Sequence, residues 1–186
     1  MSRVFVITGP SGVGKGTLIR TLLQRMPELE LSVSATTRRP RPGESDGVDY
    51  HFISDEEFDH RVEAGDFAEH ASYSGRRYGT LRSELERRTA AGIPVVLEIE
   101  VQGARQVAQT LPDALRIFIA PPSEAALRTR LVGRGTDDPE QVEARMATAR
   151  RELEAQGEFP HVVVNDRLDE AVDTLEEIVR TATLSA

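Results

Sequence analysis

The chain has 186 residues, of which 39% are hydrophobic and 29% are charged, and this length predicts one well-buried domain with room for a mobile subdomain. Its formal net charge of −8 argues against a general binder of nucleic acid or anionic membranes, because both activities need summed positive potential. The sequence contains no cysteine, which excludes disulfides and thiolate chemistry.

Hydrophobic runs alternate with amphipathic segments along most of the chain. This pattern predicts strands at 3–8, 94–99, 114–119 and 161–164, and helices at 15–26, 80–91, 101–110, 123–132 and 168–182. Strands that alternate with helices predict a parallel sheet with its ligand crevice at the carboxyl ends of the strands. Between about 30 and 80 the pattern changes. There, short β-like pieces at 31–34, 50–53 and 67–73 and a short helix at 54–64 predict an inserted subdomain.

The first predicted strand leads into a glycine-rich stretch, Gly9-Pro10-Ser11-Gly12-Val13-Gly14-Lys15-Gly16-Thr17, which we call the phosphate loop. Its glycines let successive N–H groups turn inward, and the next helix adds its N-terminal dipole, as is typical of a phosphate site. Lys15 is the only lysine among 23 basic residues, and it can reach the β- and γ-phosphates of a nucleotide. The alternative is an ordinary turn between strand and helix, and the spacing of the flanking elements argues against it.

The residue after Lys15 is a glycine, where such loops usually carry a hydroxyl that binds Mg²⁺. We therefore expect Mg²⁺ to be held mostly by phosphate oxygens and water, an arrangement that suits an ion that keeps its hydration shell. Thr17 and Glu98 are the candidate protein ligands, because Thr17 follows one position later and the strand at 94–99 ends in carboxylates. The alternative for Glu98 and Glu100 is a strand end that simply enters solvent.

Arginines gather in the predicted insert at Arg38, Arg39 and Arg41, between hydroxyl residues and prolines. Such a segment is a poor helix former and a suitable fork for a phosphate dianion. A solvated basic loop is the alternative interpretation. The prolines and Tyr50 argue instead for a loop of defined shape.

Together, these features resemble the guanylate kinase family. The resemblance runs from about Arg3 to about Val179 and rests on the phosphate loop, on 97–103 and on Ser34, Arg38, Arg41, Glu44, Tyr50, Glu69 and Tyr78-Gly79-Thr80. It implies an α/β, P-loop NTPase three-layer fold with a parallel central sheet. The family-like domain would span 2–181, with a core at about 2–33, 81–123 and 158–186, a mixed α/β GMP-binding insert at about 34–80 and a helical lid at about 124–157.

For the acceptor nucleotide, the resemblance implies that the GMP monophosphate is held by Arg38, Arg41, Tyr50 and Tyr78, and the base by Glu69. Guanine presents two parallel donors, N1–H and N2–H₂, to a carboxylate, whereas adenine presents an acceptor at N1, so Glu69 would set base specificity.

Three further residues are assigned to the GMP site by the same resemblance. Ser34 and Thr80 are similar to family hydroxyls beside the base. Glu100 stands where the family more often has aspartate. Its contact is therefore left open: it could reach the base, the metal or neither of them.

For the donor nucleotide, the resemblance implies that ATP binds to the phosphate loop. Arg130, Arg134 and Arg145 match lid positions that close over the ATP phosphates, and with Lys15 and Arg38 they are the expected catalytic cations. Glycines on both sides of Arg134 would let this segment hinge.

Three other residues near the end of the chain need separate interpretations. Asn165 is similar to the residue that approaches the adenine of ATP, and it is equally suited to cap the helix that follows. Arg150 and Arg151 match no catalytic position, and we expect them to pair with neighbouring glutamates at i,i+4 on an exposed face.

The predicted reaction is therefore ATP + GMP ⇌ ADP + GDP, with dGMP as a further acceptor and Mg²⁺ as cofactor. Two alternatives stay open. A phosphopeptide-binding module without catalysis is opposed by the intact phosphate loop and the lid arginines, and a related kinase with another acceptor is opposed by Glu69 and Tyr78. The start of the chain lacks the apolar core of a signal peptide and no apolar run is long enough to span a membrane, so we expect a cytoplasmic protein with small-molecule partners.

Overall fold

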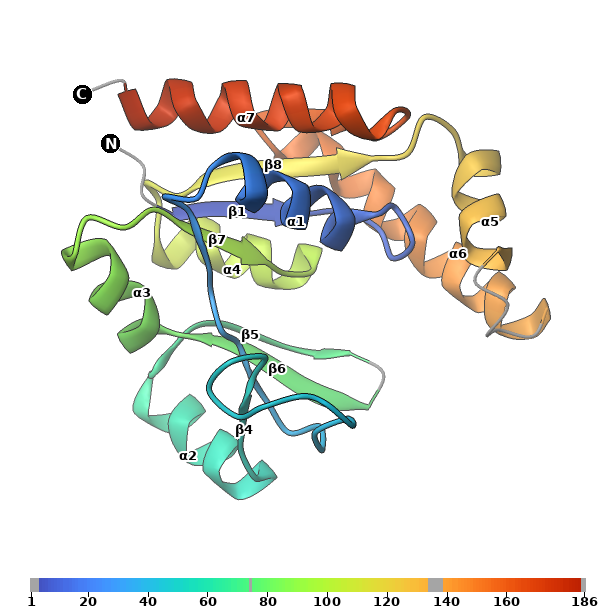
Figure 1. Cartoon of the computed structure of the whole chain (residues 1–186). Coiled ribbons are helices and arrows are strands. Elements are labelled where there is room, and N and C mark those ends of the chain that lie inside the picture. Colours follow the sequence, from blue (N-terminus) through green and yellow to red (C-terminus); the bar gives the residue numbers. More distant parts are fainter. Residues whose placement is uncertain (1–3, 74, 134–138, 185–186) are drawn as a thin grey trace.

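The computed structural model describes residues 4–73, 75–133 and 139–184. Figure 1 shows a central sheet covered by helices, an insert with its own sheet on one side, and a pair of helices, α5 and α6, at one end. Within the described ranges, none of the helices has the length and hydropathy that a membrane crossing requires.

The central sheet is parallel and, in the described part of the chain, has five strands in the order β2-β7-β1-β8-β9. Its strands are β1 (Val4–Thr8), β2 (Glu30–Leu31), β7 (Val95–Glu98), β8 (Leu115–Ala120) and β9 (His161–Val164). Apolar side chains on both faces are typical of a parallel sheet that is covered on both sides. In β1, Ile7 pairs with Glu98 of β7 and Ile117 of β8. The phosphate loop and the β7 carboxylate therefore leave the sheet at the same edge.

Helices cover both faces of this sheet and complete three layers. On one face, α1 (Lys15–Arg25) and α7 (Leu168–Leu184) bury residues such as Leu18, Leu22 and Leu175 in the larger core cluster. On the other face, α3 (Arg82–Ala90) and α4 (Val101–Thr110) contribute Leu85 and Val107 to a second cluster. The predicted three-layer α/β fold is confirmed.

The insert is built on a mixed sheet of four strands, counted in the described residues, in the order β4-β3-β6-β5. Its elements are β3 (Ala35–Thr36), β4 (His51–Phe52), α2 (Asp55–Ala64), β5 (Phe67–Tyr73) and β6 (Arg76–Leu81). A small core holds them together, in which Phe58 stacks on Phe67 with ring centroids 4.5 Å apart. Ser54 caps α2, because its hydroxyl accepts from the backbone N of Glu57 at 3.1 Å.

The segment predicted as a lid contains α5 (Glu124–Val132) and α6 (Pro139–Glu154), and a 3₁₀ turn at Ala155–Glu158 follows. Arg134 lies between them, outside the described residues. The expected i,i+4 pairing of Arg150 and Arg151 is wrong. Arg150 donates to Glu124 of α5 at 2.6 Å and so joins the two helices, and Arg151 donates to the carbonyl oxygen of Ala147 and the hydroxyl of Thr148, both at 3.4 Å.

Two other predicted elements differ from the structure. The helix predicted from residue 80 begins at Arg82, because the preceding residues form β6 and pair with both β5 and β3. The pattern groups the β-like piece at 31–34 with the insert, while the expected domain boundaries place most of it in the core; in the structure Leu31 pairs with Val96 and extends the central sheet as β2. In both cases the pairing partner is remote in sequence, so local pattern could not identify it.

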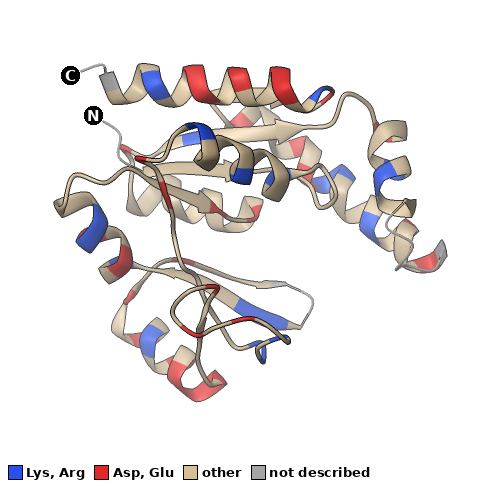
Figure 2. Cartoon of the chain, viewed as in Figure 1, with Lys and Arg blue, Asp and Glu red and all other residues tan. Residues whose placement is uncertain are grey.

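Charge is distributed unevenly over these elements. Acidic residues recur along α7 and at the start of α2, whereas arginines recur on α5, α6 and the insert (Figure 2).

Candidate active site

The phosphate loop leaves β1 and enters α1 at the carboxyl edge of the central sheet. Gly9, Gly12 and Gly14 adopt φ values of 148°, 87° and 100°, which side chains rarely allow. At Gly9 a Cβ atom would also lie 2.3 Å from the carbonyl oxygen of Ile119 in β8. These glycines let the loop lie flat against the sheet and turn its N–H groups toward one concavity.

Lys15 begins α1 and is buried, with 8% of its surface exposed. Its Nζ donates to the carbonyl oxygen of Gly9 at 2.5 Å and of Pro10 at 3.4 Å. The ammonium group therefore lies across the phosphate loop, and the loop carbonyls satisfy it within the protein.

Arg130 of α5 and Asn165 after β9 also hold the loop through hydrogen bonds to its backbone. Arg130 donates to the carbonyl oxygen of Val13 at 3.1 Å and to that of Asn165 at 2.8 Å. The Asn165 amide donates to the same Val13 oxygen at 2.8 Å. The Asn165 amide thus binds the phosphate loop. The contact with the adenine of ATP that the sequence suggested for Asn165 stays a prediction.

Two residues of α6 contact Ser11 in the loop. Arg145 donates to the Ser11 hydroxyl at 2.9 Å, and the Ser11 backbone N donates to Glu152 at 3.3 Å. Sequence reasoning missed Glu152. The available signal was the spacing of Glu152 from Arg145, because residues seven positions apart lie on the same face of a helix. Burial, and then the nearby carboxyl group of Glu100, raise the pKa of Glu152 to about 7.

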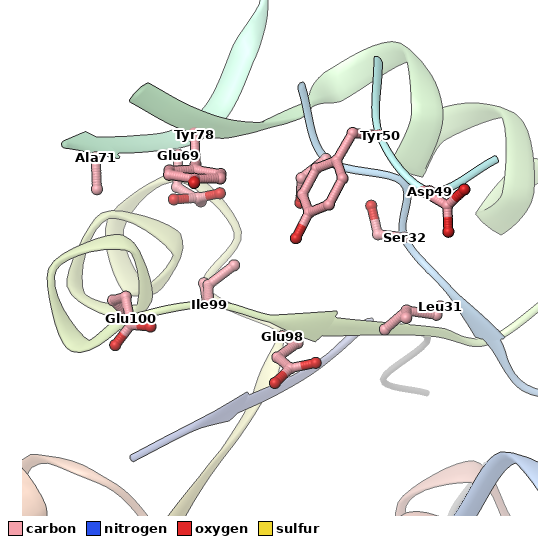
Figure 3. Close-up of a pocket in the computed structure, with 11 residues that line it drawn as sticks. Leu31, Ser32, Asp49, Tyr50, Glu69, Ala71, Tyr78, Glu98, Ile99 and Glu100 are labelled. Carbon is pink, nitrogen blue, oxygen red and sulfur yellow. The ribbon is translucent and has the colours of Figure 1, made fainter. Parts of the chain in front are cut away.

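A cavity of about 330 Å³ lies between the insert and the central sheet (Figure 3). The sheet side contributes carboxylates at the end of β7 and the start of α4, and the insert side contributes aromatic rings and the two carboxylates of Asp49 and Glu69. The lining residues include Leu31, Ser32, Ser34, Asp49, Tyr50, Glu69, Ala71, Tyr78, Glu98, Ile99 and Glu100. Of the eight residues predicted for the GMP site, five line this cavity: Ser34, Tyr50, Glu69, Tyr78 and Glu100.

Glu69 is the most buried carboxylate of this cavity, with 4% of its surface exposed. Its Oε1 accepts from the Thr80 hydroxyl at 2.7 Å, so the predicted residue Thr80 lies directly behind it. Burial raises the pKa of Glu69, and the hydrogen bonds from Thr80 partly oppose that rise. A buried carboxylate is stabilised when its remaining lone pairs accept hydrogen bonds from donor groups.

Arg38 is held in a fixed orientation in the insert. Its two terminal nitrogens donate to the two carboxylate oxygens of Glu44, both at 2.9 Å, and its guanidinium lies 5.2 Å from the Tyr50 ring centroid. The Glu44 carboxylate raises the pKa of Arg38, and Arg38 lowers the pKa of Glu44. Glu44 also accepts from the backbone N of Arg41 at 2.7 Å, while Arg41 itself is exposed.

Glu98 connects the cavity with the phosphate loop. It lines the cavity, and its carboxylate oxygens lie 3.7 and 3.9 Å from the point where a Cβ of Gly16 would stand. Burial raises the pKa of Glu98, and the positive charge of Lys15 opposes the rise. The carboxylate oxygens of Glu98 therefore lie beside Gly16, the position at which similar loops carry a hydroxyl.

Three features define the class of protein as a P-loop nucleotide kinase. They are a glycine loop at the carboxyl edge of a parallel sheet, an insert with a polar cavity, and arginine-bearing helices over the loop. The guanylate kinase family model matches residues 1–182. The chain is 55% identical over 174 residues to a guanylate kinase of Synechococcus sp. (strain CC9902), with 94% of this chain and 93% of the relative covered. It is 50% identical over 177 residues to one of Thermobifida fusca, covering 95% and 90%.

A solved structure gives the same result. The crystal structure of guanylate kinase from Anaplasma phagocytophilum matches with a TM-score of 0.79 and 31% identity, covering 100% of this chain and 88% of that one. The chain belongs to the guanylate kinase family.

Proposed function

We propose that this chain transfers the γ-phosphoryl group of ATP to GMP to give ADP and GDP, with dGMP as a second acceptor. The observation that carries the proposal is the buried Glu69, which lies in a cavity that Glu98 links to the phosphate loop. The relatives at 50–55% identity are named guanylate kinase, and the match covers nearly their whole length.

In this proposal the guanine base enters the cavity and donates N1–H and N2–H₂ to Glu69. The pairing satisfies a carboxylate that burial has deprived of water, so a base without these donors would leave it unpaired. Ser34 lines the cavity and would lie beside the base, whereas the buried Thr80 would act through its hydrogen bond to Glu69. Glu100 lines the same cavity, and we assign it to the GMP side.

The GMP monophosphate is then held by Arg38, Arg41, Tyr50 and Tyr78. The bidentate pair with Glu44 supports this role, because it presets the Arg38 guanidinium at the edge of the cavity. The rings of Tyr50 and Tyr78 lie 6.1 Å apart at the same place and add hydroxyl groups for a phosphate.

ATP binds through the phosphate loop, with its adenine toward Asn165. Lys15, Arg130 and Arg145 neutralise its phosphates, and each is already hydrogen-bonded to the loop or to a loop side chain. We infer that the lid helices and the insert close over both nucleotides, which would exclude water and protect ATP from hydrolysis.

The residues beside Gly16 fit a magnesium ion that keeps most of its water. Thr17 and Glu98 would hold the hydrated ion, and both offer the oxygen donors that Mg²⁺ prefers. Among the described residues no group of three or more histidine or acidic side chains could hold a metal ion. When bound, Mg²⁺ supplies charge neutralisation between the ATP phosphates.

The chain's own residues need not supply a strong base, because the attacking GMP phosphate is already an anion. Catalysis is then a matter of position and charge. Arg38 and Glu69 would fix the acceptor, and Lys15 with the lid arginines would stabilise the charge on the transferred group.

A coupled ADP-release assay with Mg-ATP against GMP, dGMP, AMP, CMP and UMP tests the proposal. We expect turnover with the two guanine nucleotides alone. Glu69→Gln should lower kcat/KM for GMP by about a hundredfold and leave KM for ATP within about twofold. Glu63→Gln on the exposed side of α2 is the matched control. Turnover with another acceptor, or with none, would overturn the proposal.

A further inference from the structure

The strand that carries Glu69 is held by helix α4 of the core. Gln106 of α4 accepts from the backbone N of His70 at 3.0 Å and donates to the carbonyl oxygen of His70 at 2.7 Å. Thr110, one turn later, donates to the carbonyl oxygen of Ala68 at 2.8 Å. The residues before and after Glu69 in β5 are therefore both fixed by side chains of the same helix.

The same helix also leaves the space that the Glu69 carboxylate occupies. Gly103 lies one turn before Gln106, and a Cβ there would stand 2.3 Å from Glu69 Oε2 and 3.0 Å from its Cδ. Heavy atoms cannot approach so closely, so any side chain at this position would move the carboxylate. The other oxygen is fixed by Thr80 at 2.7 Å.

We propose that Gln106, Thr110 and Gly103 are positioning residues that set the Glu69 carboxylate for the two donors of guanine. The inference rests on the proposed function, in which Glu69 binds the base. Base recognition by a carboxylate needs two parallel hydrogen bonds, whose strength falls steeply with misalignment. Fixing the backbone on both sides of Glu69 supplies that alignment, and it ties the specificity group in the insert to the core that holds ATP.

A purely structural role for these contacts predicts a different result. If Gln106 only joined the insert to the core, its loss would lower stability and would leave the choice between bases unchanged. IMP separates the two roles, because it keeps the N1–H of guanine and lacks the 2-amino group. The ratio of kcat/KM for GMP to that for IMP then measures the second hydrogen bond to Glu69.

The test compares Gln106→Leu with Gln109→Leu, an exposed glutamine on the same helix. We expect Gln106→Leu to lower the GMP/IMP ratio by about tenfold and to leave KM for ATP within about twofold, because a small displacement of a positioned group is costly. In a Glu69→Gln background, the same substitution should change the ratio by less than about twofold, since its effect passes through Glu69.

Two outcomes would overturn the inference, and they can be told apart. If Glu69→Gln abolishes the preference for GMP while Gln106→Leu leaves the ratio unchanged, the positioning role is wrong and the proposed function stands. If Glu69→Gln itself leaves the ratio unchanged, the base assignment fails and the positioning role fails with it.

A second variant keeps the inference testable if Gln106→Leu does not fold. Gly103→Ala removes no hydrogen bond and places a methyl group against Glu69 Oε2. We expect it to lower kcat/KM for GMP by about tenfold and to leave KM for ATP within about twofold. Unchanged GMP kinetics in this variant would also overturn the inference.

Discussion

The backbone N–H of Ser11 in the phosphate loop donates to the carboxylate of Glu152 near the end of α6, across an N···O distance of 3.3 Å. This contact joins α6 to the phosphate loop. Burial, and then the negative charge of the neighbouring Glu100, raise the pKa of Glu152 to about 7.

Stability should therefore depend on pH through Glu152. Its pKa rises from about 4.5 to about 7 on folding, so the folded chain binds a proton that the unfolded chain releases within that window. The free energy of unfolding should fall as pH rises through the window, with the stabilisation complete below about 4.5 and lost above about 7. Glu152→Gln should reduce the change in the free energy of unfolding across this pH window by about 1 kcal/mol, after allowance for partial solvent access.

Urea denaturation at about pH 5 and about pH 8 measures this effect. Glu154→Gln, an exposed glutamate on the same helix, is the control and should keep the wild-type pH dependence. An unaltered slope in Glu152→Gln would show that the proton is bound elsewhere.

Gly9 should tolerate a side chain less well than another glycine of positive φ. Gly9→Ala meets both the strain of a φ of 148° and a backbone oxygen at 2.3 Å, whereas Gly43→Ala has a φ of 90° and nothing within 4 Å. We expect a loss of about 1 kcal/mol in Gly43→Ala and more than about 3 kcal/mol in Gly9→Ala. Chemical denaturation compares them, and equal losses would contradict the close packing of the loop on β8.

Gly16 should accept the hydroxyl that similar loops carry. A Cβ there would lie 3.7 Å from both Arg20 Nη1 and Glu98 Oε1, which is ordinary contact. Gly16→Ser should therefore keep stability within about 0.5 kcal/mol. Because it adds an oxygen donor beside Glu98, it should lower the Mg²⁺ concentration for half-maximal activity several-fold, to be measured by titration at fixed ATP. Gly16→Ala supplies the control, and a matching shift in that variant would rule out the hydroxyl as its cause.

Arg38 should be sensitive even to a substitution that keeps its charge. Its planar fork binds both oxygens of Glu44, and lysine cannot reproduce that geometry. Arg38→Lys should raise KM for GMP by about tenfold and leave KM for ATP within about twofold. Steady-state kinetics with Arg39→Lys, an exposed neighbour, provides the comparison. Equal effects in both variants would assign the loss to general charge in the loop.

The sequence alone was sufficient for the three-layer architecture and for the position of the phosphate loop between strand and helix. The period of its apolar residues predicted the alternation of strands and helices, and the spacing from Gly9 to Thr17 predicted the phosphate loop. Both are local signals, carried by neighbouring residues in one element. They were sufficient because a glycine loop between a buried strand and a helix has few other conformations.

The tertiary structure decided the contacts between elements that are remote in sequence. His70 and Gln106 are 36 positions apart in the sequence, and Ser11 and Glu152 are 141 positions apart, so no local pattern indicates these pairs. The same holds for Leu31, whose place in the central sheet depends on β7. Pairing across such distances is selected by the packing of the whole core, since each isolated segment has several partners of similar energy. The sequence thus determined which groups could bind phosphate and base, and only folding decided which neighbours orient them.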